Sequence, residues 1–292
     1  MATGRLSLDS VTVGGATYNN VVVTVNTYAL QSVAGGASGA TSFDPASNIL
    51  TLGAVSFQGA TYNNVRVSIG SYALTANTYS DCANNSSLVS VGNTYQSVMQ
   101  GTDQSVASTT TTVNRTTTYN GVNALEVQAD SVILAGTNAG ATIGMKSYMQ
   151  VAASSINTLG SVTTVSLPAQ GTLVVSMAFS PAIQSPLNLA LNVPVSQSMS
   201  VATTNSLTGS MTATTAQTVT YQGMEVVAVP AGTFTTCKVR SDTVTSSGNS
   251  SASASQTSWR IASGPYRGLV AKTLDHKTSV QSVATKLSLN GV

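Results

Sequence analysis

Residues 6–30 read LSLDSVTVGGATYNNVVVTVNTYAL, and residues 50–74 read LTLGAVSFQGATYNNVRVSIGSYAL. The two segments are identical at 14 of 25 positions, and the matches include an unbroken GATYNNV at 15–21 and at 59–65. Self-similarity of this kind indicates one structural unit used twice. A unit of this size is too small to bury its own apolar face. We therefore expect each copy to pack on the other copy, on the rest of the chain or on another molecule.

Each copy has the pattern of a β-hairpin. The glycines at 14–15 suit the positive φ angles of a tight two-residue turn. Such a turn pairs residues whose numbers sum to 29, so that Val11 lies opposite Tyr18. The same register in the second copy places Val55 opposite Tyr62.

The apolar residues change face midway along each hairpin. In an unbroken strand Val11 falls on one face and Leu8 on the other, and Tyr18 and Val21 do the same on the opposite strand. Paired bulges would bring both sets to one face, whereas a regular hairpin would present them to two different neighbours. We favour two neighbours. The residues predicted to form an assembly or packing interface are Leu6, Leu8, Val11, Val13, Tyr18, Val21, Val23, Leu50, Leu52, Val55, Phe57, Tyr62, Val65 and Val67.

The composition is typical of β-structure with a hydroxyl-rich surface. Only 20 of 292 residues are charged, whereas Ser and Thr number 42 each, and Val alternates with them over long stretches. A net charge of +2 without a basic cluster argues against nucleic acid or an anionic membrane surface as a partner. No apolar run approaches the roughly 20 residues of a membrane-spanning helix, so we expect no membrane span.

The rest of the chain reads as strands separated by Gly, Pro and polar turns. We expect an all-β protein in which two tandem hairpins (1–30 and 50–75) are followed by a curved antiparallel sheet, half-barrel or sandwich (88–292), with linkers at 31–49 and 76–87. The strands predicted in the last region are 94–99, 108–119, 124–134, 161–167, 172–179, 199–204, 211–221, 224–229, 233–241, 255–260, 268–273 and 282–289. Residues 141–155 are predicted to hold a short helix.

The two cysteines, Cys82 and Cys237, lie 155 positions apart and fit no metal-binding spacing. They form either a disulfide, which in the chain-entropy model would contribute about 4 to 5 kcal/mol, or two buried thiols. Low charge, abundant hydroxyls and an even cysteine count favour an extracytoplasmic location. Residues 1–10 lack the apolar core of a signal peptide, so either export is not signalled here or the chain is a mature form.

No residue set forms a catalytic signature, so we expect no enzyme activity, and no cofactor or metal. His276 lies among polar neighbours, and no G-x-S-x-G elbow accompanies it. Glu126 and Glu225 each stand singly in a strand pattern, whereas glycoside hydrolysis requires a carboxylate pair at a defined separation. The repeated tyrosines, such as Tyr18 and Tyr62, fit three roles, in order of preference: cross-strand packing, an interface with another molecule, and a platform for glycan binding.

The region from residue 88 onward resembles small exported bacterial β-proteins called TapB-like or left as domains of unknown function. The segments that carry this resemblance are LVSVGNTYQ (88–96), GVNALEV (121–127), FSPAIQSPLNLALNVPVSQSMS (179–200), VVAVPAGTFTTCKV (226–239), Trp259 and GPYRGLVAK (264–272). The resemblance implies a strongly curved antiparallel sheet, similar in shape to periplasmic lipoprotein carriers. A second aromatic residue of that family is replaced by Ser198-Met199. The repeats resemble a unit found at the ends of secreted proteobacterial proteins, and neither resemblance implies an activity.

These features support two hypotheses of function. The first is an exported structural protein, a self-associating subunit of an extracellular fibre, sheath or matrix assembled by β-strand addition. The alternative is a periplasmic or cell-surface binding module that holds a lipid or other apolar small molecule in a curved sheet, or a glycan on its tyrosines. Either places the protein outside a bacterial cell or at its surface.

Overall fold

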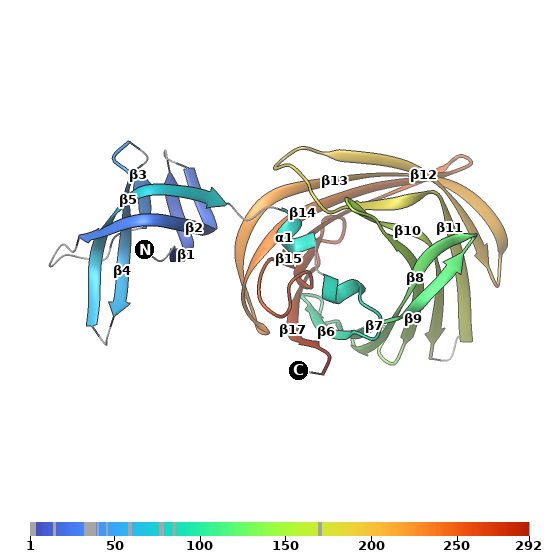
Figure 1. The fold of residues 1–292 in the computed structure, drawn as a ribbon. Helices are drawn as coiled ribbons and strands as arrows, with labels where there is room; N and C mark the ends of the chain where they lie inside the picture. Colours follow the sequence, from blue (N-terminus) through green and yellow to red (C-terminus); the bar gives the residue numbers. More distant parts are fainter. Residues whose placement is uncertain are drawn as a thin grey trace. The chain divides into compact units, whose positions relative to one another are not determined.

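The structure of the protein, a computed structural model, describes residues 4–13, 16–31, 39, 41–44, 46–57, 60–75, 79–83, 86–168 and 171–291. The chain forms two compact units, Met1–Asn77 and Thr78–Val292. Both units consist mainly of β-strands, which confirms the predicted all-β class (Figure 1).

The first unit is a small closed barrel with the strand order β1-β2-β5-β4-β3. Its strands are β1 (Gly4–Val13), β2 (Ala16–Gln31), β3 (Ser42–Asp44), β4 (Ile49–Phe57) and β5 (Ala60–Thr75). The long strands β2 and β5 pair antiparallel, and β1 closes the barrel by pairing parallel with β3. Each repeat therefore packs on the other copy, one of the three possibilities that the sequence left open. Strand β3 comes from the segment that we expected to be a linker.

The predicted hairpin register is confirmed in both repeats. Val11 pairs with Tyr18 in the first copy, and Val55 pairs with Tyr62 in the second. The sequence that the two copies share thus accompanies the same strand pairing. The turn residues 14–15 and 58–59 lie outside the described residues.

The backbone of the second repeat is irregular at the position where the apolar residues change face. Asn64 has a φ of 52°, in the left-handed region, between the regular pairs Leu52–Val65 and Ala54–Asn63. The Asn64 side chain accepts a hydrogen bond from the backbone N–H of Gly39, 3.0 Å away. The connection between the repeats thus contacts the irregular position.

The apolar residues at the base of the second repeat lie in the core of the first unit. Leu50, Val65 and Val67 are buried, whereas Tyr62 near the hairpin tip is 45% exposed. Leu52 and Val55 are half-buried. The side chains of the remaining predicted interface residues lie outside the described part of the chain: Leu6, Leu8, Val11, Val13, Tyr18, Val21, Val23 and Phe57. An interface with two neighbours therefore stays a prediction.

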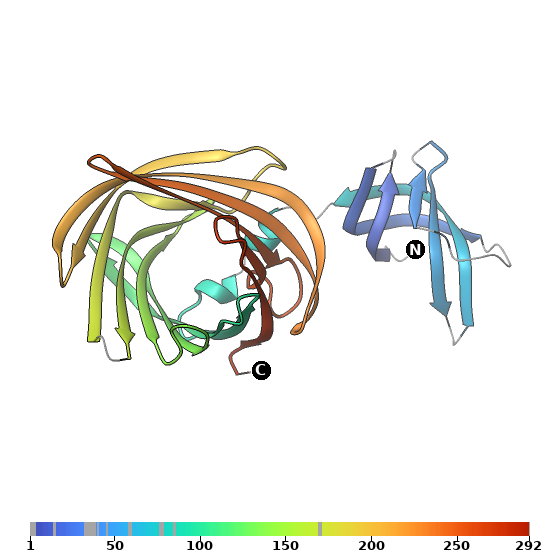
Figure 2. The same ribbon diagram turned by 180° about the vertical axis from the view of Figure 1, so that it is seen from behind.

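The second unit is a closed antiparallel barrel of twelve strands, a more definite architecture than the half-barrel or sandwich expected from the sequence (Figure 2). Its strand order is β10-β11-β12-β13-β14-β15-β16-β17-β6-β7-β8-β9, and β9 closes the ring by pairing with β10. The strands are β6 (Thr94–Gly101), β7 (Val106–Tyr119), β8 (Val122–Ala135), β9 (Thr142–Val151), β10 (Ser155–Leu167), β11 (Gly171–Pro186), β12 (Val195–Asn205), β13 (Gly209–Val229), β14 (Gly232–Ser247), β15 (Ser250–Ile261), β16 (Val270–Asp275) and β17 (Gln281–Leu289).

Two sequence expectations for this unit are wrong. The predicted short helix at 141–155 is strand β9, which pairs along its length with β8 and β10. The two strands predicted at 211–221 and 224–229 are one strand, β13. Gly223 adopts a φ of 111° next to the register shift that follows Tyr221, so β13 bulges there instead of ending.

Two short helical turns precede the barrel strands, α1 (Tyr79–Ala83) and the 3-10 turn η1 (Ser86–Val89). Figure 1 shows α1 inside the ring of strands, next to β14 and β15. Among the described residues, no helix combines the length and apolarity needed to cross a membrane.

Candidate ligand site in the barrel lumen

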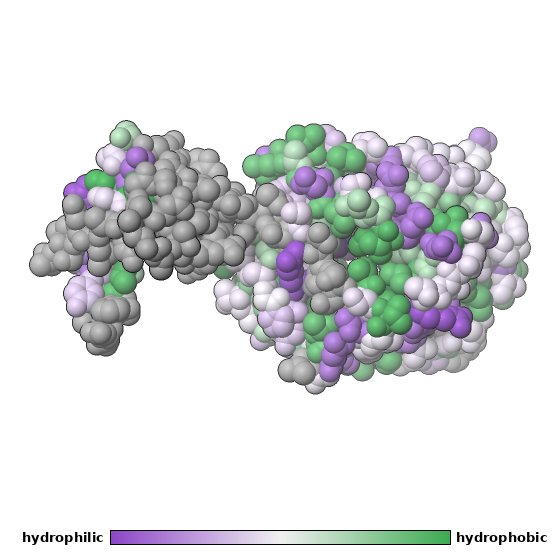
Figure 3. Space-filling model, viewed as in Figure 1, coloured by the Kyte–Doolittle hydropathy of each residue, from purple (hydrophilic) through white to green (hydrophobic). Residues whose placement is uncertain are grey.

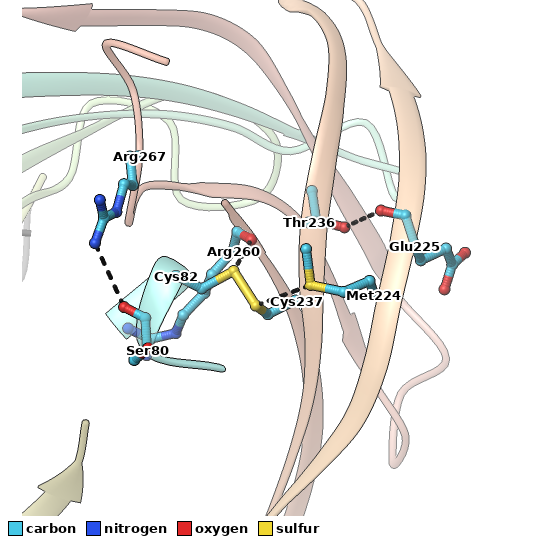
Figure 4. Close-up of a disulfide and its surroundings, with 8 residues drawn as sticks. All are labelled: Ser80, Cys82, Met224, Glu225, Thr236, Cys237, Arg260 and Arg267. Carbon is cyan, nitrogen blue, oxygen red and sulfur yellow. Dashed lines mark hydrogen bonds between the residues drawn. A yellow bond between two sulfur atoms is a disulfide. The ribbon is translucent and has the colours of Figure 1, made fainter. Parts of the chain in front are cut away.

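A disulfide holds α1 against the barrel wall. Cys82 of α1 and Cys237 of β14 are bonded, so the structure contains the bridge that the sequence offered as one of two possibilities. The guanidinium of Arg267 donates a hydrogen bond to the backbone carbonyl of Ser80, 3.5 Å away (Figure 4). These contacts fix the helical turn inside the ring at two points.

Apolar side chains pack around this disulfide. The rings of Tyr79 and Tyr221 have centroids 5.5 Å apart and are tilted by 46°. Leu189, Val239 and Ala262 are buried in the same cluster. Burial of two aromatic rings and several aliphatic groups stabilises the position of α1 inside the barrel.

Two cavities flank α1 in the lumen. One has a volume of about 230 Å³ and the other about 380 Å³. Ala83, Ile156, Ser185 and Arg260 line both, so the cavities adjoin one another. Pockets for small ligands in proteins have volumes of roughly 300 to 1,000 Å³. The two spaces together fall within that range.

The two cavities differ in chemistry. The smaller one is mixed. Amide and hydroxyl groups of Gln184, Gln217, Gln256, Ser241 and Ser258 line it together with apolar side chains such as Leu187, Val219 and Val239. Apolar side chains dominate the larger one, which includes Leu88, Val89, Met149, Leu269 and Val270. Figure 3 shows apolar and polar residues side by side on one face of the larger unit. The lumen is therefore amphipathic.

Arg260 lies where the two cavities meet. Side chains alternate along β15, so Ser258 and Arg260 face the lumen while Trp259 and Ile261, both buried, face the other way. Among the described residues that line the two cavities, Arg260 is the one charged side chain. Figure 4 shows the side chain extending toward α1.

The charge of Arg260 acts on a neighbouring phenol in the larger cavity. Burial raises the pKa of Tyr95, and a hydrogen bond with Thr111 together with the positive charge of Arg260 lowers it in part. The net shift of the Tyr95 pKa is upward, so this residue remains a neutral hydrogen-bonding group at neutral pH. The larger cavity therefore contains a neutral phenol, in addition to the hydroxyls of Ser97, Thr158 and Ser185, beside its apolar walls.

On the opposite face of β15, Trp259 is held by a cluster of charged groups. Its indole N–H donates to Oε2 of Glu225, 2.9 Å away, and the ammonium group of Lys272 lies 4.5 Å from the ring centroid. Lys238 lies 5.4 Å from the same centroid and forms an ion pair of 3.7 Å with Glu225. This cluster covers the wall behind Arg260 and fixes the strand that carries it.

A second ionic cluster surrounds Glu126 on β8. The carboxylate accepts a hydrogen bond from Arg115 at 3.2 Å and from Asn114 at 3.2 Å, and it lies 3.6 Å from the ammonium group of Lys146. Burial alone would raise the pKa of Glu126, but these hydrogen bonds and positive charges lower it, and the net shift is downward. Glu126 and Glu225, weighed above as a carboxylate pair, thus belong to two separate ion-pair clusters.

His276, the remaining candidate for catalysis, has a hydrogen-bonding partner on the barrel wall. His276 Nε2 lies 2.8 Å from Oγ1 of Thr257, a buried residue on β15. Within the part of the chain that the structure describes, no three His, Cys, Asp or Glu side chains gather as a metal site would require.

The lumen residues were not singled out by sequence reasoning. Arg260 and the three glutamines come from three strands, β11, β13 and β15, and no single segment of the sequence groups all four. One signal was present: Gln256, Ser258 and Arg260 alternate with Thr257 and Trp259, so one face of this strand carries polar groups.

No protein-family model matches this chain, and no curated protein sequence does either. Two solved structures are similar in part. One is described as a putative lipoprotein from Parabacteroides distasonis, with 12% identity, a TM-score of 0.39 and coverage of 68% of this chain and 96% of that chain. The other is described as a putative exported protein with a YmcC-like fold from Bacteroides fragilis, with 11% identity, a TM-score of 0.38 and the same coverage. Nothing about function rests on these similarities, and the TapB-like resemblance remains an expectation.

Proposed function

We propose that the protein is an exported binding protein whose larger barrel holds a small amphipathic molecule in its lumen, beside α1. The observation that carries this proposal is the pair of adjoining cavities, one rich in amide groups and one mainly apolar, around a disulfide-tethered helical turn. Ligand sites of this kind combine apolar walls with a few placed polar groups, and they occur in the interior of β-barrels.

A location outside the cytoplasm is part of the proposal. The disulfide between Cys82 and Cys237 supports it, because such bonds persist in oxidising compartments and are rare in reducing ones. The low content of charged residues agrees with a surface that relies on hydroxyl and amide groups for solubility.

Assembly into a fibre by strand addition stays a prediction, and the described fold offers it little support. Strand addition needs an open sheet edge, and both sheets close into barrels. Sedimentation at high protein concentration tests this hypothesis, since a strictly monomeric protein would contradict it.

The binding proposal is tested with an uncharged probe that fluoresces in apolar surroundings, N-phenyl-1-naphthylamine. Ile156 lines both cavities, so Ile156→Trp is expected to fill the lumen and to abolish most of the probe's fluorescence enhancement. Val226→Trp is the matched control, because Val226 is 53% exposed and lines neither cavity. We expect this control to bind the probe like the unmodified protein.

Two results would overturn the proposal. One is the absence of any enhancement with the unmodified protein. The other is equal enhancement with Ile156→Trp and Val226→Trp, which would place the probe on the surface. Circular dichroism of each variant establishes that the barrel is intact.

A further inference from the structure

Among the described residues that line the two cavities, Arg260 carries the one charge. Arg260 lines both cavities, and the other described residues that line them are uncharged. The ion pairs between described residues of this unit lie elsewhere, at Glu126, Glu225 and Asp242. One cation in a space otherwise lined by amide, hydroxyl and apolar groups creates a positive potential at a defined point.

The guanidinium of Arg260 is available to a ligand. More than a third of this residue is exposed, and no described side chain forms an ion pair or a hydrogen bond with its guanidinium nitrogens. An arginine presents five donors in a planar fork that matches a carboxylate or phosphate group in a bidentate arrangement.

The position of Arg260 also orients a ligand. On one side of it lie the amides of Gln184, Gln217 and Gln256, which supply further hydrogen bonds to a polar head. On the other side lie the aliphatic side chains of the larger cavity, among them Met149 and Leu269, which favour a hydrocarbon segment. The boundary between the two chemistries coincides with the charge.

We infer that the lumen selects an anionic amphiphile, with the acidic head group on Arg260 and the apolar tail in the larger cavity. This inference rests on the proposed function and names the class of its ligand. The shared chemistry is an oxyanion on a single hydrocarbon chain, whether a carboxylate or a phosphate monoester. Arg260 binds the head group through noncovalent contacts alone.

The test compares three ligands with the same tail: dodecanol, dodecanoate and dodecyl phosphate, each measured by displacement of the naphthylamine probe. The unmodified protein is expected to bind at least one of the two anions about tenfold or more tightly than the alcohol, as expected for charge-assisted hydrogen bonds. Which anion binds better identifies the head group. In Arg260→Gln this preference is expected to disappear while the affinity for dodecanol remains.

Lys238→Gln is the matched control, because Lys238 is a cation on the adjacent strand that contacts Trp259 on the other face of the wall. It is expected to keep the preference for the anion. Arg260→Lys keeps the charge without the fork and is expected to retain part of that preference.

The outcomes separate the inference from the proposed function. Equal affinity for alcohol and anions in the unmodified protein, or a preference that survives in Arg260→Gln, overturns the inference and leaves the binding function standing. Failure to bind any of the three ligands or the probe overturns both. Circular dichroism establishes whether each variant is folded.

Discussion

Cys82 in the five-residue helix α1 is bonded to Cys237 in the middle of β14, at a sequence separation of 155 residues. The bond fixes inside the barrel a helical turn that is too short to be stable by itself. It thereby makes α1 a wall of both lumen cavities, since Ala83 lines each of them.

Removing this bond is expected to destabilise the protein strongly. Closing a loop of this length lowers the entropy of the unfolded chain, and the chain-entropy model gives about 4 to 5 kcal/mol. We expect the double variant Cys82→Ala, Cys237→Ala to lose stability of this order in urea unfolding. Reductant should destabilise the unmodified protein and leave the variant unchanged. A loss below about 1 kcal/mol would show that packing around Tyr79 holds α1 without the bond.

Glu126→Gln is expected to destabilise the larger barrel in a pH-dependent way. The pKa of Glu126 is lower in the native protein than in the unfolded chain, where it is near 4.5. The stability that the ionised carboxylate contributes is therefore fully present above the unfolded pKa and is lost as the pH falls through the native pKa. At neutral pH we expect a loss of about 1 to 3 kcal/mol, because the hydrogen bonds from Asn114 and Arg115 lose their charged acceptor. In acid the two proteins should converge.

Asp130→Asn on the same strand is the control for this charge change, because Asp130 is exposed. Its effect on the free energy of unfolding is expected to stay within about 0.5 kcal/mol. A difference between Glu126→Gln and the unmodified protein that is constant across the acid range would contradict the assigned role of the ion pairs.

Gly160→Ala is expected to disturb the wall of the barrel. A Cβ at this position would overlap Tyr119 Oη and lie 2.7 Å from the backbone carbonyl of Met177. Overpacking of this kind costs about 1 to 3 kcal/mol, which thermal unfolding would detect. Gly144→Ala on the neighbouring strand β9 is the matched control, because its nearest contact is the flexible carboxylate of Asp130 at 3.2 Å. Equal effects of the two variants would argue against the packing of Tyr119 on Gly160.

Glu225→Ala is expected to destabilise the protein more than Glu225→Gln. The alanine variant leaves the buried indole N–H of Trp259 without its acceptor, at a cost of about 1 to 3 kcal/mol, whereas glutamine keeps an acceptor oxygen. The ion pair with Lys238, lost in both, is partly exposed and contributes about 0 to 1 kcal/mol. Because Trp259 is the single tryptophan of the chain, its fluorescence during urea unfolding measures both variants directly. Identical urea midpoints of Glu225→Ala and Glu225→Gln would mean that water accepts the hydrogen bond of the indole in place of the carboxylate.

Strand content and local pairing were predictable because they depend on short-range patterns. The alternation of Val with Thr and Ser identified most strands, and the repeated turn glycines fixed the register that pairs Val11 with Tyr18. The errors arose where a local signal was ambiguous. Strand β9 shows no strong β-branched pattern, and Gly223 suggested a strand end where the backbone only bulges.

The sequence by itself determined the all-β class, the two matched hairpins and the pair of cysteines, since each follows from residues close in the chain or from their mere count. Only the tertiary structure decided that the sheets close into barrels, that Cys82 meets Cys237, and that Arg260 stands at the meeting point of two unlike cavities. Closure depends on which distant strands form hydrogen bonds, such as β9 with β10 and β17 with β6. A lumen site is assembled from single residues of many strands, and their convergence is a property of the ring and not of any one segment.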